Sequence, residues 1–345
     1  MSSPTRLWYS GLAAVLGFAS ASVLLAEEAT RLDIRWSPVV DLHFQARVAA
    51  SSKTPSAELA PLAGAVRKVN EPLGGDLLSW GIVEGALYGC STAADVRAAF
   101  ADFPERFNLR SPRGNAGDAG REIELRKLGA ELADALAQVE PGYLTAIAPL
   151  DEQIVGRAST VLAERLGPKE AVCLRYMTEH LGPEDPKAVI PVYLVADMPA
   201  PGAVTQLRPG RVGGVCFVAV RDVEPLQLVE TVLHEATHAL DVVWKETAVL
   251  DRLRSKLRAA AAALRPGDLR DVPHTLMFVH AGETVRRNID PSHRHYGDVS
   301  GYYAKLSRAT QAVRGPWIDY LDGKIPRDQA LDRIVAALGS DTASP

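Results

Sequence analysis

Two histidines and a glutamate fall within five consecutive residues of this chain, as His234, Glu235 and His238. Residues four apart share one face of a helix, so the two imidazoles would lie one turn apart and could bind one metal ion at about 2 Å each. Glu235 could then hold a water molecule on that metal and accept its proton. The spacing therefore predicts a metal centre with its own general base. The alternative is a surface helix whose polar face carries the same residue types.

The residues around this motif have the pattern of an amphipathic helix. Pro225 stands near the expected first turn, with acidic residues just before it. Apolar residues then recur at spacings of three and four along one stripe, and His234 and His238 project from roughly the opposite side. The stripe consists of Val229, Val232, Leu233, Ala236, Leu240, Val243 and Trp244. Asp241, one turn after His238, could hydrogen-bond a ligand imidazole or could be an ordinary solvated residue.

A catalytic metal needs a third protein ligand, and a helix further along the chain offers a candidate. That segment, expected over residues 271–288, is apolar on most sides, yet it carries His280, Glu283 and Arg287 on one face. Buried ionisable groups are usually paired, hydrogen-bonded or bound to metal. We therefore expect Glu283 as the third ligand, with His280 as an alternative ligand or as its partner. The other interpretation is a buried His–Glu–Arg network without metal.

Residues 190–300 resemble zinc metallopeptidases of the gluzincin type. The resemblance rests on the HExxH motif and, more weakly, on the helix that carries Glu283; the longer metzincin pattern is absent, because Trp244 stands where it has a further ligand. The resemblance implies one Zn²⁺ per chain, held by the two motif histidines and Glu283 with water in the fourth position, and Glu235 as general base. The chain departs from that family at Arg287, where an aspartate often follows.

Amide hydrolysis also requires a donor that stabilises the oxyanion. The segment after the Glu283 helix is rich in suitable groups, and we expect Tyr296 and His295 to supply it, because they lie in a turn that could fold over the cleft. Tyr302 and Tyr303 follow, and they read equally well as core residues of a helix. His293 and His295 are also rival metal ligands, in a less rigid setting.

The elements that must position these groups give a mainly helical α+β fold. Short apolar runs rich in β-branched and aromatic residues at 190–196 and 213–220 predict a small β-sheet ahead of the motif helix. An extended peptide could add to the edge of that sheet, although a buried hairpin would have the same pattern. We expect a helical N-terminal region at 27–185 and a zincin-like domain at 186–340. Residues 111–120 read as a flexible stretch.

The N-terminus has the pattern of a secretory signal. Arg6 is followed by a charge-free apolar run at 7–26 that ends in small residues. We expect residues 1–26 to be a signal peptide or an uncleaved signal anchor, since the run is just long enough to span a bilayer. The protein is then exported, periplasmic or extracellular, and contacts the membrane only if the segment is retained.

The charge balance bears on which partners the protein can bind, and the cysteine content bears on which disulfides it can form. Arg6 is the only charged residue among the first 26, so the rest of the chain has 37 basic and 42 acidic residues, and we expect no nucleic acid as a partner. Cys90, Cys173 and Cys216 allow at most one disulfide, and the pattern does not show which pair would form it. The sequence does not determine the oligomeric state.

These patterns favour a zinc-dependent peptidase that hydrolyses bonds in a peptide or protein substrate. Two alternatives fit the same residues. One is a non-catalytic binding protein of the cell envelope on a peptidase-like scaffold. The other is a metal-dependent hydrolase of a non-peptide amide or ester.

Overall fold

A computed structural model describes residues 29–52, 57, 59–73, 77–101, 118–207, 213–244 and 248–340. The predicted signal segment at 1–26 lies outside these ranges, as does most of the stretch expected to be flexible at 111–120. No helix within the described ranges combines the length and apolar character needed to cross a bilayer.

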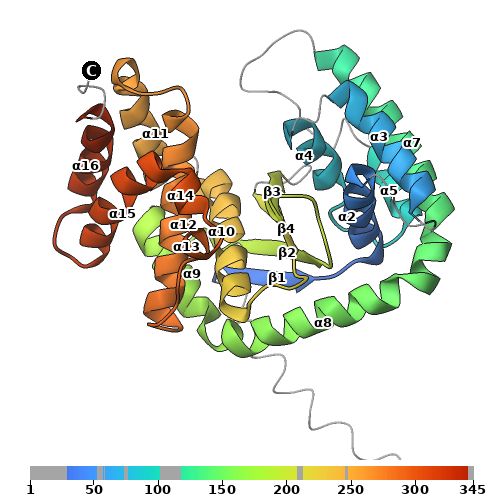
Figure 1. The fold of residues 1–345 in the computed structure, drawn as a ribbon, viewed down its shortest axis with the longest axis horizontal. Helices are drawn as coiled ribbons and strands as arrows, with labels where there is room; N and C mark the ends of the chain where they lie inside the picture. Colours follow the sequence, from blue (N-terminus) through green and yellow to red (C-terminus); the bar gives the residue numbers. More distant parts are fainter. Residues whose placement is uncertain are drawn as a thin grey trace, which may run out of the picture.

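A four-stranded mixed sheet forms the centre of the molecule (Figure 1). Its order is β1-β2-β4-β3, with β1 at Arg31–Arg35, β2 at Val189–Val195, β3 at Ala203–Leu207 and β4 at Gly214–Ala219. The first three strands in this order are parallel, and β3 pairs antiparallel with β4 at the edge. β2 and β4 confirm the two predicted strands. The sequence patterns did not predict β1 and β3, because each strand has only five residues and carries polar side chains.

Helices account for most of the remaining described chain, which confirms the predicted mainly helical α+β fold. Those before the second strand are α2 (Pro38–Ser51), α3 (Ala60–Leu73), α4 (Leu77–Ala86), α5 (Ala93–Ala101), α7 (Asp118–Ala146), α8 (Ala148–Arg165) and α9 (Glu170–Leu181). Those after the sheet are α10 (Pro225–Trp244), α11 (Val249–Ala259), α12 (Asp268–Asn288), α13 (Tyr296–Val299), α14 (Tyr302–Lys305), α15 (Ser307–Leu321) and α16 (Arg327–Ser340).

The sheet separates two hydrophobic cores, because successive strand residues point to opposite faces. Val192 and Leu194 of β2 join the core built with α8 to α12, whereas Tyr193 and Val195 join the core built with α2 to α7. Both faces of β2 are therefore buried. β1, from the N-terminal half of the sequence, pairs with β2 and contributes Leu32 to the core of the C-terminal helices.

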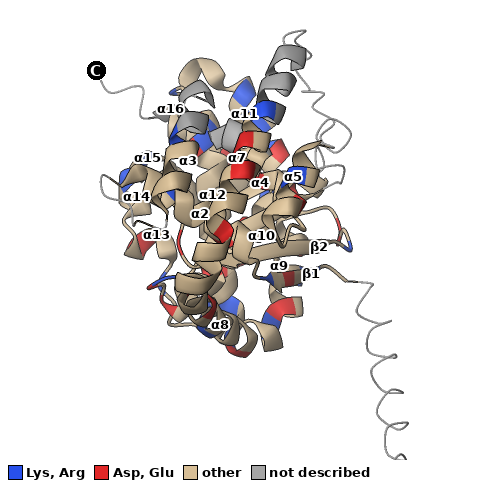
Figure 2. Ribbon diagram, turned by 90° about the vertical axis from the view of Figure 1, so that its right-hand side faces the viewer, with Lys and Arg blue, Asp and Glu red and all other residues tan. Residues whose placement is uncertain are grey.

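Charged residues of both signs are distributed over the molecule. Figure 2 shows Lys and Arg interspersed with Asp and Glu along the described helices, α8 among them.

Candidate metal centre

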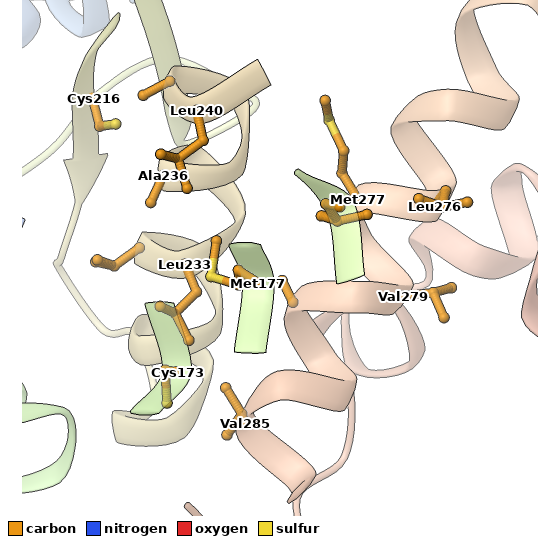
Figure 3. Packing of buried hydrophobic residues seen from close by; sticks show 14 of the residues in the cluster. Cys173, Met177, Cys216, Leu233, Ala236, Leu240, Leu276, Met277, Val279 and Val285 are labelled. Atoms are coloured by element: carbon orange, nitrogen blue, oxygen red, sulfur yellow. The ribbon is translucent and has the colours of Figure 1, made fainter. Parts of the chain in front are cut away.

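The HExxH motif lies in the middle of α10, as its periodicity predicts. Leu233, Ala236 and Leu240 lie on one side of this helix, in the same core cluster as Met177 of α9 and Met277 of α12 (Figure 3). This apolar side fixes the rotation of the helix about its axis. The motif histidines are consequently held on the side that faces the start of α12.

Three histidines meet there: His234 and His238 of α10 and His274 of α12, each offering a ring nitrogen within 4.8 Å of the others. The Nε2 atoms of His234 and His238 are 3.2 Å apart. Two nitrogens bound at about 2.0–2.1 Å to one tetrahedral ion would lie about 3.3 Å apart. His238 and His274 are partly exposed, so the group is open to solvent on one side. The donor set and its spacing fit a zinc ion.

Burial keeps these imidazole rings in their neutral form, which is the form that binds a metal ion. It is the main cause that lowers the pKa of His234 well below its usual value, and the neighbouring His238 and His274 add to the effect. Burial, with His274 and Arg254, lowers the pKa of His238 to about 3, and burial also lowers the pKa of His274. All three imidazoles are therefore neutral at physiological pH, and each can offer a lone pair to a metal.

The orientation of His274 is set by a hydroxyl on a different helix. Its Nδ1 atom lies 2.9 Å from the hydroxyl oxygen of Tyr302 on α14. Because that nitrogen is engaged, Nε2 is the atom left to face the other two imidazoles. Phe278, one turn after His274, stacks on the ring of His234 with centroids 3.7 Å apart and planes at 21°. Aromatic rings therefore support one side of the group.

Glu235 lies on α10, where it is buried against β3, the edge strand of the sheet. The residue is 4% exposed, and its Oε2 atom lies 2.6 Å from the hydroxyl oxygen of Thr205 on β3. Burial raises the pKa of Glu235 to about 7, and the hydrogen bond from Thr205 opposes that rise. A carboxyl group with a pKa near neutrality is suited to exchanging protons.

The expected third ligand, Glu283, lies elsewhere in the structure. Its carboxylate accepts hydrogen bonds from Arg286 at 2.6 Å and Arg287 at 2.8 Å, and it lies 3.3 Å from Nε2 of His295. Burial raises its pKa, but these three partners outweigh burial and hold the pKa well below its usual value. Glu283 follows His274 by nine residues, which is two and a half turns, so the two side chains leave opposite sides of α12. Glu283 thus belongs to a buried ionic network of the kind considered above, with Arg287 as a partner but with His295 in place of His280.

The other candidate histidines also belong to internal networks rather than to the three-histidine group. His280 accepts a hydrogen bond from Trp317 Nε1 at 3.3 Å and stacks on Tyr176 with planes at 6°. His293 Nε2 lies 2.6 Å from Oε2 of Glu230, a buried residue of α10. His295 is buried between Glu283 and the hydroxyl of Tyr303, 3.2 Å from its Nδ1 atom, so its ring is enclosed.

Two remaining candidates lie near the group in different ways. Asp241 is ion-paired with Arg254 of α11 at 2.6 Å, so its carboxylate binds a guanidinium rather than an imidazole. Tyr296 is partly exposed, and its backbone N–H donates to Glu230 at 2.7 Å. Its ring faces Phe278 with centroids 6.2 Å apart and planes at 13°. Tyr296 thus lies on the same side of the three-histidine group as Phe278.

Sequence reasoning missed His274 and Thr205, and it named Tyr302 without predicting its contact with His274. His274 did carry a signal, because it stands in the first turns of the helix already expected to supply the third ligand. Thr205 carried none, since it lies in a short strand with no alternation of apolar and polar residues to mark it.

A group of three histidines, one of them buried and two partly exposed, in a helical α+β fold is consistent with a zincin-like site. Comparison with known proteins assigns no family, since no protein-family model, no curated protein and no solved structure matches this chain.

Proposed function

We propose that this chain is a zinc-dependent peptidase in which His234, His238 and His274 hold one Zn²⁺ and Glu235 is the general base. The observation that carries the proposal is the meeting of three neutral imidazoles from two helices beside a buried glutamate. Three protein ligands leave a fourth position for water or substrate, which distinguishes a catalytic zinc from a structural one.

The chemistry divides between the metal and the chain. Bound zinc would lower the pKa of a water molecule and polarise a substrate carbonyl. Glu235 would take the proton of the attacking water on its carboxylate and deliver it to the leaving nitrogen, so that the peptide bond breaks into an acid and an amine. The aromatic rings of Phe278 and Tyr302 would exclude water from one side of the group.

A peptide substrate is favoured by the position of β3. This strand is at the edge of the sheet, and its residue Thr205 contacts Glu235 directly. An extended peptide can add to a sheet edge through its backbone, which would bring successive carbonyls past the general base. Neither a small amide nor an ester would use such an edge.

Tyr296 is the proposed donor to the oxyanion. Its hydroxyl can donate a hydrogen bond, its backbone is held by Glu230, and its ring faces Phe278 beside His234. His295, the other expected donor, is enclosed by Glu283 and Tyr303.

Export of the chain remains a proposal that rests on residues 1–26. Determining the N-terminal residue of the protein recovered from its host distinguishes a cleaved signal peptide from a retained anchor. Recovery of the intact N-terminus in the cytoplasmic fraction would contradict export.

Metal analysis tests the zinc site. Purified wild-type protein is expected to contain one zinc per chain, and Glu283→Gln is expected to retain it, whereas His274→Ala is expected to lose it. Zinc retained in His274→Ala but lost in Glu283→Gln would reverse the ligand assignment.

Turnover of a peptide library tests the reaction. Glu235→Gln is expected to keep zinc and to lose hydrolysis by more than about a hundredfold, because the amide cannot accept the proton. Zinc-loaded wild type that cleaves no peptide would refute the peptidase. Assays with ester and amide substrates would then separate another hydrolase from a binding protein.

A further inference from the structure

The general base is attached to the edge strand by one hydroxyl group. Thr205 Oγ1 lies 2.6 Å from Oε2 of Glu235 and 2.9 Å from the backbone oxygen of the same residue. Within the part of the chain that the structure describes, no other side chain hydrogen-bonds this carboxylate. The position of Glu235 Oε2 therefore depends on Thr205.

The hydroxyl is itself held in place by the sheet. Thr205 is paired with Cys216 in the β3–β4 register, and its Oγ1 atom lies 3.4 Å from the Cys216 sulfur. Gly214 lets the sheet approach the helix, since a Cβ at this position would come within 2.6 Å of the Thr205 methyl carbon and 3.1 Å of Ala239 Cα. Thr205 is thus fixed against α10 by backbone pairing and close packing, which makes its hydroxyl a rigid anchor.

We propose that Thr205 is the positioning residue of Glu235, holding Oε2 so that Oε1 is the oxygen that exchanges the proton during hydrolysis. A glutamate side chain has three rotatable bonds, and restricting them in advance spares the cost of ordering the base in the transition state. The same strand that would align an extended substrate would then align the base. This inference rests on the proposed function.

The test uses full-length, zinc-loaded protein and four variants. Thr205→Val keeps the shape and removes the hydroxyl, Thr205→Ser keeps the hydroxyl, and Thr205→Ala removes the hydroxyl without adding bulk. Thr178→Val is the matched control, because Thr178 is a buried threonine of α9 whose hydroxyl donates to the backbone oxygen of Arg175 at 2.8 Å.

Two readouts are measured: peptide turnover, and the affinity for acetohydroxamate by calorimetry. Acetohydroxamate binds zinc through its oxygens and presents donors to a neighbouring carboxylate, so its affinity reports the position of Glu235 without turnover. Thr205→Val is expected to lower kcat about tenfold with KM changed less than about twofold, and to weaken acetohydroxamate about tenfold, as for a hydrogen bond to a charged group. For Thr205→Ser, both kcat and the affinity for acetohydroxamate are expected to stay within about threefold of the wild-type values. For Thr178→Val, both are expected to equal the wild-type values.

The outcomes separate this inference from the proposed function. Equal kcat and equal acetohydroxamate affinity in wild type and Thr205→Val would overturn the role of Thr205. Loss of zinc or of the folded state in both Thr205→Val and Thr205→Ala would also overturn it, because the residue would then be structural. If the wild type binds acetohydroxamate but cleaves no peptide, the proposed peptidase activity is refuted. The ratio of the acetohydroxamate affinities of wild type and Thr205→Val would still decide whether Thr205 positions Glu235. A wild type that binds neither zinc nor acetohydroxamate would overturn both.

Discussion

At the scale of single residues, the chemistry depends on which nitrogen of each imidazole is available. Tyr302 engages Nδ1 of His274 at 2.9 Å, and this contact leaves Nε2 for the three-histidine group. A metal-binding histidine is commonly oriented through its second nitrogen in this way. Tyr302 is therefore the outer partner of the three-histidine group.

Removing that hydroxyl should weaken the site. Tyr302→Phe is expected to lower zinc affinity about tenfold, since loss of such an outer partner typically costs 10- to 100-fold. The measurement is competition with a chelator of known affinity. Tyr303→Phe is the matched control, because the Tyr303 hydroxyl contacts His295 and not the three-histidine group. Equal zinc affinity in the two variants would show that Tyr302 does not orient His274.

At the scale of elements, the site depends on how closely the motif helix packs on the sheet. α10 lies against β3 and β4, and Gly214 permits this spacing, because a Cβ there would lie 2.6 Å from the Thr205 methyl carbon and 3.1 Å from Ala239. A methyl group added at this point must move the helix or the edge strand. Either movement would shift Glu235 relative to Thr205.

Glycine substitutions test this packing. Gly214→Ala is expected to lower the free energy of unfolding by about 1–3 kcal/mol through overpacking. Gly156→Ala, on an exposed part of α8 with nothing within 4 Å of the added Cβ, is expected to raise it by about 0.5–1 kcal/mol, because alanine favours a helix over glycine. Urea unfolding monitored by circular dichroism measures both. If Gly214→Ala leaves the free energy of unfolding unchanged, the helix can move away from the sheet without loss of stability.

Between the two cores, a buried polar network joins the N-terminal helices to the sheet. Asp41 of α2 accepts hydrogen bonds from the backbone N–H of Ala196 at 2.7 Å and from the Tyr143 hydroxyl at 2.8 Å. Tyr143 also lies 3.3 Å from Asp151 of α8, which binds Arg221 after β4 at 3.1 Å. Burial, together with the charge of Asp151, raises the pKa of Asp41 to about 7. In the unfolded chain its pKa would be near 3.8.

This network should make stability depend on pH. The folded state holds the Asp41 proton more tightly than the unfolded state, so the Asp41 contribution to stability is present at pH 4 and is lost as the pH rises toward 7. The slope is roughly 1.4 kcal/mol per pH unit within that window. Asp41→Asn, which keeps an acceptor for Ala196 and has no proton to lose, should become more stable relative to wild type as the pH rises. The free energy of unfolding of both proteins is measured by urea unfolding from pH 4 to pH 8. An equal change with pH in the two proteins would show that Asp41 does not cause the pH dependence.

Much of the fold was predictable because helical and strand periods are local properties of the chain. The apolar stripe around Leu233 and Leu240 predicts α10 and the side from which His234 and His238 project, and two apolar runs predict β2 and β4. β1 and β3 were not predictable from these patterns. Their short sequences become strands only by pairing with β2 and β4.

Helical geometry alone places the two imidazoles and the carboxyl group on one helix, because residues four apart lie one turn apart. Which residues complete the site follows from how the helices pack. His274 is 36 positions after His238, and the packing of α12 on α10 brings its face to the motif. Glu283 lies on the opposite side of α12, where its partners are Arg286, Arg287 and His295. Burial of an ionisable group implies that it has a partner, but the identity of that partner depends on which helix faces meet.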